Sequence, residues 1–321
     1  MRRVIAVIGA ALAFAAVGPS VAVAVVEKPP TGTVVEYRLP ITALPSGITK
    51  GPGGNLWFTL EQSRYVGYVT PHGTFRLFSL PAAGNEGGIN PGPDGNVWFT
   101  EYTSRMVSHI NSTTGQLTRF PLTGNPGVGG IAAGADGNMW FLESSADKIG
   151  RITTRGVMTL FTVPTAGAFP HGLNLGPDGN IWFNEFSASK IGRIRPNGVI
   201  TEYRLPTANA KPDVIVAGPD GNLWFTEDIG KIGRITANGV ITEFRLPNSS
   251  AWPVGIAPGP DGNLWFTEKA AGKIGRITPT GVITEFALPN AASQPDKIVS
   301  GPDGNLWFTE HNGDKIGRIT P

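Results

Sequence analysis

The chain has 321 residues, of which 40% are hydrophobic and 16% charged, and it contains 44 glycines, 28 prolines and no cysteine. A chain of this length and apolar content can bury a full core, which excludes a disordered protein, and the missing cysteines exclude a fold held together by disulfides. With 26 basic and 24 acidic side chains and no basic cluster, the charge balance argues against nucleic acid as a partner.

The N-terminal segment, residues 1–24, reads as a secretory signal peptide. It has a basic start at Arg2 and Arg3, an apolar run of about 15 residues, and small residues at Ala22 and Ala24 suited to cleavage. An uncleaved anchor is the alternative, but the run is short for a membrane span. We therefore expect a secreted or extracytoplasmic mature protein with no membrane span after cleavage, in which residues 25–32 form a short linker.

Residues 33–321 contain a unit that is repeated seven times. A Trp-Phe pair recurs every 41 or 42 residues, and each unit parses into four short apolar or β-branched runs separated by Gly, Pro, Asp and Asn. Four antiparallel strands in each of seven units predict an all-β fold, a seven-bladed β-propeller. The repeated tryptophans are Trp57, Trp98, Trp140, Trp182, Trp224, Trp265 and Trp307.

The two ends of the repeat region distinguish a closed ring from a linear solenoid. Residues 33–40, "TVVEYRLP", match a fourth-strand phrase, and residues 315–321, "KIGRITP", match a third-strand phrase. The seventh unit therefore lacks its own last strand, and the N-terminus can supply it. We expect this pairing to close the ring through hydrogen bonds, which removes the exposed sheet edges.

Two repeated features are best interpreted as structural. Side chains alternate along "NLWFTE", so Leu and Phe should face one neighbouring blade and Trp the other. A glutamate three residues after Trp, such as Glu185, is followed in units three to seven by a lysine across the next turn, such as Lys190. Leu60 and Tyr65 replace both residues in unit one, which favours a cross-strand ion pair between them. Unit two, with Glu101 and Met106, departs from this pattern.

Function should be sought where one copy differs from the others. Eleven residues before each Trp, at the start of the innermost strand, the seven units carry different side chains. Because the first strand begins and the second ends at the same mouth of the channel, His171 should lie near Glu185, with Asp213 and Glu227 at the same level in the next blade. A histidine beside a carboxylate can act as a general base. The residues at this position are Ser46, Gly87, Gly129, His171, Asp213, Val254 and Asp296.

His171 also has a structural interpretation. It could be a rim histidine that only accepts a hydrogen bond, and in a regular strand it would point between blades together with Leu173. Of the other histidines, His72 lies in a turn and His109 in an outer strand, whereas His311 follows Glu310 at the same mouth and could join a site.

The phrases "GPDGNLWFTE", "KIGRIT" and "GVITEFRLP" resemble the virginiamycin B lyase (streptogramin B lyase) family over residues 33–321. The resemblance implies a magnesium-dependent carbon-oxygen lyase that opens the ester of a cyclic depsipeptide antibiotic and so confers antibiotic resistance. Within "FPHG" it implies His171 as the general base, and it makes Glu185 and Glu227 candidate magnesium ligands. Where the family carries a second histidine in an adjacent blade, this chain has Gly129 before His171 and Asp213 after it. Where the family carries a metal-binding glutamate, this chain has Phe169 or Lys211.

Three functions are compatible with these observations. The first is a streptogramin lyase with His171 as base. The second is a non-catalytic propeller that binds a peptide, glycan, protein or other small ligand at the mouth. The third is a metal-dependent lactonase with a cation held by Asp213, Asp296 and Asn174. We expect a monomer in each case. The varied rim of the binding propeller would consist of Phe169, Trp252, Asp213 and Asp296, with His311 as a further binding candidate at the same mouth.

Overall fold

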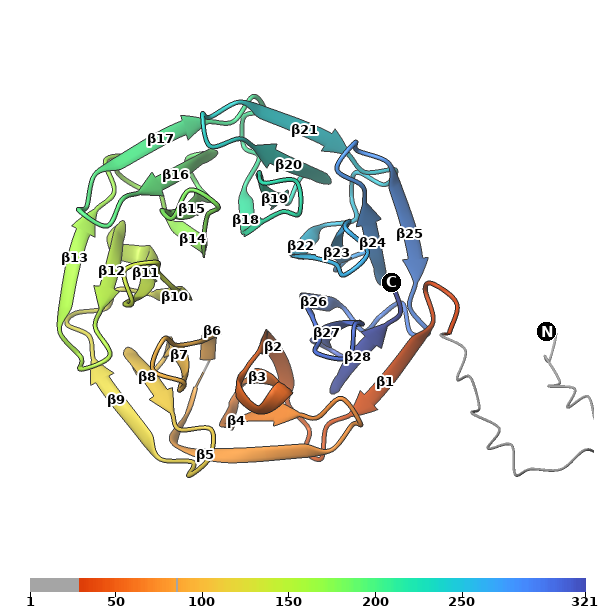
Figure 1. Cartoon of the computed structure of the whole chain (residues 1–321), viewed down its shortest axis with the longest axis horizontal. Helices are drawn as coiled ribbons and strands as arrows, with labels where there is room; N and C mark the ends of the chain where they lie inside the picture. The colour runs from red at the N-terminus through yellow and green to blue at the C-terminus, as the bar shows by residue number, and fades with distance from the viewer. Residues whose placement is uncertain (1–28, 85) are drawn as a thin grey trace, which may run out of the picture.

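The computed structural model describes residues 29–84 and 86–321, so the predicted signal peptide and residues 25–28 of the linker lie outside the described residues. Seven four-stranded antiparallel sheets surround a central axis as the blades of a propeller (Figure 1). This confirms the predicted fold. Among the described residues, no helix is long and apolar enough to cross a membrane.

The strands follow the repeat, with blades numbered from the first Trp. Blades 1 to 3 consist of β2 (Leu44–Lys50), β3 (Leu56–Glu61), β4 (Ser63–Val69) and β5 (Phe75–Gly84), then β6 (Glu86–Pro91), β7 (Val97–Glu101), β8 (Met106–Ile110) and β9 (Leu117–Pro121), then β10 (Val128–Ala133), β11 (Met139–Glu143), β12 (Lys148–Ile152) and β13 (Met158–Thr162). Blades 4 and 5 consist of β14 (Pro170–Leu175), β15 (Ile181–Glu185), β16 (Lys190–Ile194) and β17 (Ile200–Arg204), then β18 (Pro212–Ala217), β19 (Leu223–Glu227), β20 (Lys231–Ile235) and β21 (Ile241–Arg245). Blades 6 and 7 consist of β22 (Pro253–Pro258), β23 (Leu264–Glu268), β24 (Lys273–Ile277) and β25 (Ile283–Ala287), then β26 (Pro295–Ser300), β27 (Leu306–Glu310), β28 (Lys315–Ile319) and β1 (Val34–Arg38). Two short 3-10 turns are η1 (Pro52–Gly54) and η2 (Ser144–Ala146).

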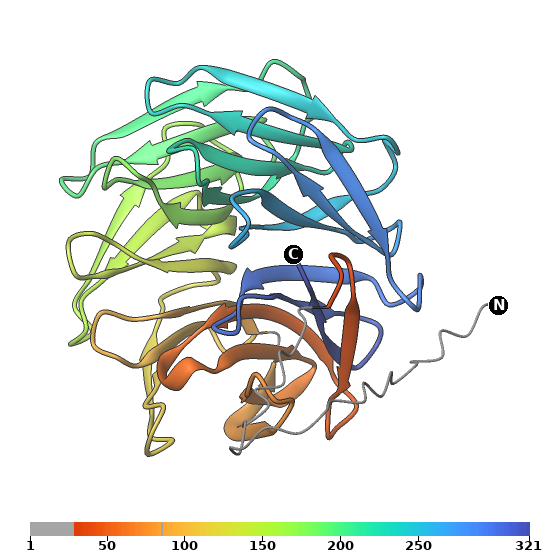
Figure 2. The same cartoon turned by 45° about the vertical axis from the view of Figure 1, so that its right-hand side comes forward.

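The two ends of the chain close the ring. Strand β1 pairs antiparallel with β28 from Val34 opposite Ile319 to Arg38 opposite Lys315. In both views the red β1 lies beside the blue strands that end the chain (Figures 1 and 2). An ion pair between Lys315 and Glu36 adds to the backbone pairing. The predicted closing strand is confirmed. A linear solenoid is excluded because the first strand of the chain belongs to the same sheet as the last three.

Packing between blades follows the predicted alternation. Trp182 of blade 4 packs with Leu223 and Phe225 of blade 5, and all three side chains are fully buried. The indole also stacks on Tyr203 of its own fourth strand, with ring centroids 5.5 Å apart. Buried aromatic pairs of this kind contribute roughly 1 kcal/mol beyond the area they bury. The repeated Trp-Phe pairs are therefore the core of the ring.

The "GPDGN" turn both reverses the chain and binds the indole nitrogen of the repeated Trp. Asp and Gly suit a tight turn, and Gly179 has a positive φ of 75°. In addition, Asp178 accepts a hydrogen bond of 2.9 Å from the indole nitrogen of Trp182. Blade 1 has Gly53 in place of this aspartate, and the buried indole nitrogen of Trp57 has no partner among the described residues.

The prediction that each lysine pairs with the glutamate three residues after Trp is wrong, because the lysine pairs with a different glutamate on the fourth strand. Lys190 lies directly opposite Glu185 in the strand register, yet its ammonium group pairs with Glu202 on the fourth strand at 2.8 Å. In blade 5, Lys231 likewise pairs with Glu243. The physical reason is solvation, because the outer position leaves the Lys190 side chain 19% exposed, whereas Glu185 is fully buried.

The inner glutamates of blades 4 to 7 are consequently buried, and within the described part of the chain neither carboxylate oxygen of Glu227 or Glu268 has a hydrogen-bond partner. Burial, followed by repulsion from the neighbouring outer carboxylate, raises the pKa of Glu227 to about 8 and that of Glu268 to about 7. Blade 2 differs because Arg119 occupies the outer position and binds Glu101 at 2.6 Å. The buried inner glutamates of blades 4 to 7 are Glu185, Glu227, Glu268 and Glu310.

Candidate functional site

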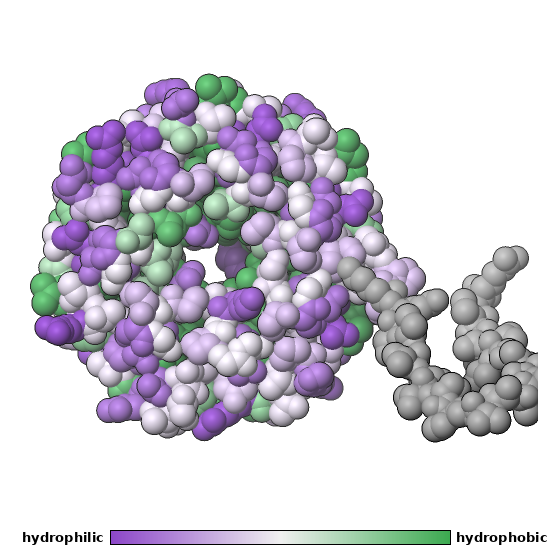
Figure 3. Space-filling view, in the orientation of Figure 1, coloured by the Kyte–Doolittle hydropathy of each residue, from purple (hydrophilic) through white to green (hydrophobic). Residues whose placement is uncertain are grey.

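The innermost strands enclose a central cavity of about 810 Å³. The space-filling view shows the opening at the centre of the ring (Figure 3). The mouth is uneven in chemistry. On the side of blades 1 to 3 the innermost strands contribute small residues such as Ser46, Gly87 and Gly129, with Glu61 and Tyr102 beside them, whereas on the side of blades 4 to 7 the innermost strands contribute charged side chains such as Asp213, Asp296 and Lys297. This charged half is the candidate site.

A β-bulge directs His171 toward the cavity. The register of β14 against β15 shifts between Pro170 and Leu173, so His171 and Gly172 are not paired in the regular ladder. Leu173 packs in the core between blades, whereas the His171 side chain lines the cavity and is 42% exposed. The expectation of a regular strand that turns both side chains between blades is therefore wrong. A Cβ atom at Gly172 would lie 2.2 Å from the carbonyl oxygen of Asp213, so this close approach requires glycine.

His171 is held by the next blade. Its Nδ1 atom is hydrogen-bonded to a carboxylate oxygen of Asp213. The ring lies nearly parallel to that of Phe169, with centroids 6.3 Å apart, and is tilted against Phe186 at 5.6 Å. The negative charge of Asp213 raises the pKa of His171. Among the residues that the structure describes, Nε2 has no partner, so it is the ring nitrogen left for a ligand.

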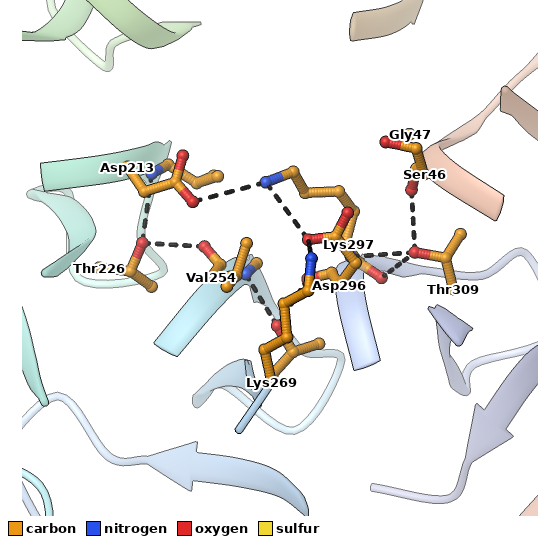
Figure 4. A network of polar contacts seen from close by, with 12 residues as sticks. Ser46, Gly47, Asp213, Thr226, Val254, Lys269, Asp296, Lys297 and Thr309 are labelled. Atoms are coloured by element: carbon orange, nitrogen blue, oxygen red, sulfur yellow. Dashed lines mark hydrogen bonds and ion pairs between the residues drawn. The ribbon is translucent and has the colours of Figure 1, made fainter. Parts of the chain in front are cut away.

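Asp213 belongs to a charge network that crosses the mouth (Figure 4). Its second carboxylate oxygen lies 3.6 Å from the ammonium nitrogen of Lys297, which lies 3.8 Å from Asp296. Lys269 approaches the same oxygen of Asp296 at 3.6 Å. Burial opposes ionisation of Asp213, but Lys297 and His171 outweigh it and hold the pKa of this carboxyl below its usual range. The network therefore joins side chains from blades 4, 5, 6 and 7.

Buried threonines tie the inner strands together at the mouth. Thr226 donates a hydrogen bond of 2.8 Å to the carbonyl of Val254, and Thr267 donates one of 2.6 Å to that of Asp296. Blades 3 and 4 depart from this pattern, since Leu142 and Asn184 replace the threonine. Asn184 is fully buried, and neither atom of its amide has a partner within the described part of the chain. The two blade interfaces beside His171 thus lack the threonine tie.

The structure separates the predicted site residues into two groups. Five of them line the cavity. Those five are Phe169, His171, Asp213, Trp252 and Asp296. Glu185, Glu227 and His311 are not among its lining residues. The two glutamates are fully buried between strands, and the Nδ1 atom of His311 is buried without a partner.

The side chains at the mouth do not fit a magnesium ion. Magnesium prefers several oxygen ligands around one point, and within residues 29–84 and 86–321 no group of three or more His, Asp or Glu side chains could hold a metal. Glu185 and Glu227 face away from the cavity, and the carboxylates of Asp213 and Asp296 are already next to lysines. We derive no chemical step through a metal.

Sequence reasoning missed Lys297 and Lys269, although comparison of the repeats could have found them. Ten residues before Trp, five units have glycine, one has Val214, and only blade 7 has a charged residue, Lys297. Four residues after Trp, every unit has a different side chain, and Lys269 is the only basic one apart from His311. Both positions adjoin residues already singled out by the repeat, Asp296 and Glu268.

Comparison with known proteins agrees with the repeat phrases. The model of the virginiamycin B lyase family matches residues 20–127 and 83–321. A streptogramin B lyase structure is 35% identical, with a TM-score of 0.86, and the match covers 90% of this chain and 97% of that one. Selenomethionine-substituted virginiamycin B lyase from Staphylococcus aureus is also 35% identical, with a TM-score of 0.85 and coverage of 90% and 99%.

A third solved structure has the same identity, TM-score and coverage as the second. It is a catalytically inactive histidine-to-alanine variant of the Staphylococcus aureus virginiamycin B lyase with quinupristin. No curated protein matches the chain. Hydrazine synthase from Kuenenia stuttgartiensis, at 16% identity and a TM-score of 0.72 over 88% of this chain and 98% of that one, shares the fold alone.

Proposed function

The chain belongs to the virginiamycin B lyase family, and on that premise we propose that it is an exported lyase that opens an ester bond at the channel mouth, with His171 as the base. The observation that carries the proposal is the His171–Asp213 pair. Asp213 fixes Nδ1 of the imidazole and leaves Nε2 on the cavity. A positioned imidazole of this kind is a typical general base.

The proposed step is an elimination. Nε2 of His171 takes a proton from the carbon next to a carbonyl, and that C–H electron pair forms a carbon–carbon double bond. The C–O bond of the ester on the adjacent carbon breaks, and the ester leaves as a carboxylate. Asp213 stabilises the imidazolium that forms, and the raised pKa of His171 reflects this stabilisation. No water is consumed, so substrate and product have the same atoms.

The relative with quinupristin supports this choice of substrate. Its catalytically inactive form is a histidine-to-alanine variant, and the present chain offers one histidine on the cavity. Exposed aromatic side chains at the rim provide apolar contact for a cyclic peptide. Phe169 is 38% exposed and Trp252 is 44% exposed. Both have positive φ values, 49° and 52°, and Lys211 and Gln294 share this conformation at the same position of blades 5 and 7, so the backbone of the repeat presents these side chains.

The test is incubation of purified residues 25–321 with quinupristin, followed by chromatography and mass spectrometry. We expect a ring-opened product of unchanged mass, whereas hydrolysis would add one water. His171→Ala should lose turnover while keeping the melting temperature of the wild type. His311→Ala, at the same end of blade 7 but outside the cavity lining, should retain turnover. Absence of turnover in the wild type, or equal turnover in His171→Ala, would refute the proposal.

A non-catalytic binding propeller is the second candidate, favoured by the two exposed aromatic residues. It predicts that quinupristin or a cell-envelope peptide or glycan raises the melting temperature and is recovered unchanged. The lactonase interpretation loses its proposed cation ligands, because Asp213 and Asp296 are next to lysines. Export is a separate part of the proposal, and recovery of the full chain with residues 1–24 in the cytoplasmic fraction would count against it.

A further inference from the structure

Lys297 stands where the fold ordinarily has no side chain. The corresponding residue is glycine in five of the seven blades and Val214 in blade 5. Glycine is favoured there because neighbouring inner strands approach closely: a Cβ atom at Gly255 would lie 2.5 Å from the carbonyl oxygen of Asp296. In blade 7 the lysine side chain extends along the channel mouth toward Asp213, as Figure 4 shows. The position therefore carries a charge in one blade only.

The ammonium group of Lys297 lies between two carboxylates. It is 3.6 Å from Asp213 and 3.8 Å from Asp296, and Lys269 is 3.6 Å from Asp296. Asp213 and Asp296 are about nine-tenths buried, at 9% and 8% side-chain exposure, whereas Lys297 is 28% exposed. A divalent cation shared by these carboxylates would have to occupy the same space as the ammonium group.

An ammonium group has three N–H donors, whereas Lys297 approaches two carboxylates and Lys269 approaches one. Both lysines also line the cavity. The two carboxylates and two ammonium groups of the network cancel in charge, and the nearby carboxyl group of Asp228 also interacts with His171 and Lys297. An acceptor oxygen of a ligand in the cavity could take a charge-assisted hydrogen bond from either ammonium group.

We infer that the ammonium groups of Lys297 and Lys269 take the place of a divalent metal at the channel mouth, and that they bind an anionic or carbonyl oxygen of the ligand. In the proposed elimination this oxygen belongs to the ester or to the departing carboxylate, and to that extent the inference rests on the proposed function. The tests below use metals and a simple carboxylate, so their outcome is independent of quinupristin turnover.

The first experiment measures the melting temperature after dialysis against EDTA, with and without added Mg²⁺ or Ca²⁺. The wild type should not respond to either ion. Lys297→Gly introduces the residue that five blades carry at this position and leaves Asp213 and Asp296 without the central ammonium group, so its melting temperature should rise with metal. Val214→Gly is the matched control at the same strand position, and it should not respond. If Lys297→Gly does not fold, Lys297→Met replaces it.

The second experiment measures binding of benzoate, a carboxylate with an aromatic ring, by calorimetry. Lys297→Met and Lys269→Met should each weaken the affinity about tenfold, the loss expected for one charge-assisted hydrogen bond. Lys50→Met removes an exposed lysine at the end of β2 and should leave the affinity unchanged. A saturable, EDTA-reversible Mg²⁺ shift in the wild type would overturn the inference. So would absence of benzoate binding, or equal affinity in the lysine variants.

Discussion

Replacing Glu227 by glutamine should stabilise the protein near neutral pH. The carboxyl group is fully buried, neither oxygen has a hydrogen-bond partner, and its pKa is raised to about 8 by burial and by Glu243. Between about pH 5 and pH 7 the native state keeps this proton while the unfolded state has lost it. Unfolding then releases a proton, so stability falls as pH rises through this range. Glutamine has nearly the same shape and never ionises.

The size of the effect follows from the separation of the two pKa values. With a pKa of 4.5 in the unfolded state and about 8 in the native state, Glu227 lowers the free energy of unfolding at pH 7 by about 3 kcal/mol relative to pH 4. Glu227→Gln should therefore gain about 3 kcal/mol over the wild type between these two pH values. The measurement is reversible urea unfolding, followed by circular dichroism at several pH values from about 4 to about 8.

Glu101→Gln is the matched control, because it changes the same strand position in blade 2. Glu101 is bound by Arg119 at 2.6 Å, so its replacement removes one partner of a buried ion pair and should destabilise the protein by about 3 kcal/mol at neutral pH. Parallel pH curves for wild type and Glu227→Gln would refute the argument that this glutamate is held neutral in the native state.

Three further changes test other parts of the structure. Asp213→Asn removes the charge that raises the pKa of His171, so the rise of kcat/KM with pH, as the imidazole loses its proton, should move to lower pH. Asn184→Thr should restore the missing tie between blades 4 and 5 and raise the free energy of unfolding by about 1 kcal/mol, measured in urea. Asp220→Gly copies the turn of blade 1 and removes the acceptor, at 2.9 Å, of the indole nitrogen of Trp224, together with the acceptor of two hydrogen bonds from Asn222. It should cost about 2 kcal/mol, and an unchanged urea midpoint would show that these hydrogen bonds together contribute nothing.

The repeat made the architecture readable from sequence. The spacing of the Trp-Phe pairs gave the number of blades, the alternation in "NLWFTE" gave the packing between them, and the phrases at residues 33–40 and 315–321 gave the closing strand. The candidate site was found in part. His171, Asp213 and Asp296 stood out because they interrupt a repeated position, whereas Lys297 and Lys269 occupy neighbouring positions that were not compared.

The errors concern side chains whose partners are chosen in three dimensions. Lys190 has a carboxylate on either side, and only the folded blade shows that the outer one, Glu202, leaves its ammonium group partly solvated. The orientation of His171 depends on a bulge, and a bulge changes the strand register without a distinctive residue to mark it.

The sequence by itself determined the blades, their order and the closure of the ring, because strand alternation and turn chemistry act over a few neighbouring residues. Only the tertiary structure decided that His171, Asp213, Lys269, Asp296 and Lys297 form one network. These residues come from four different blades. Their contacts depend on how closely the inner strands approach one another around the axis. They also depend on whether each charged group is solvated by water or paired with a neighbouring charge. Neither can be determined from a local stretch of chain.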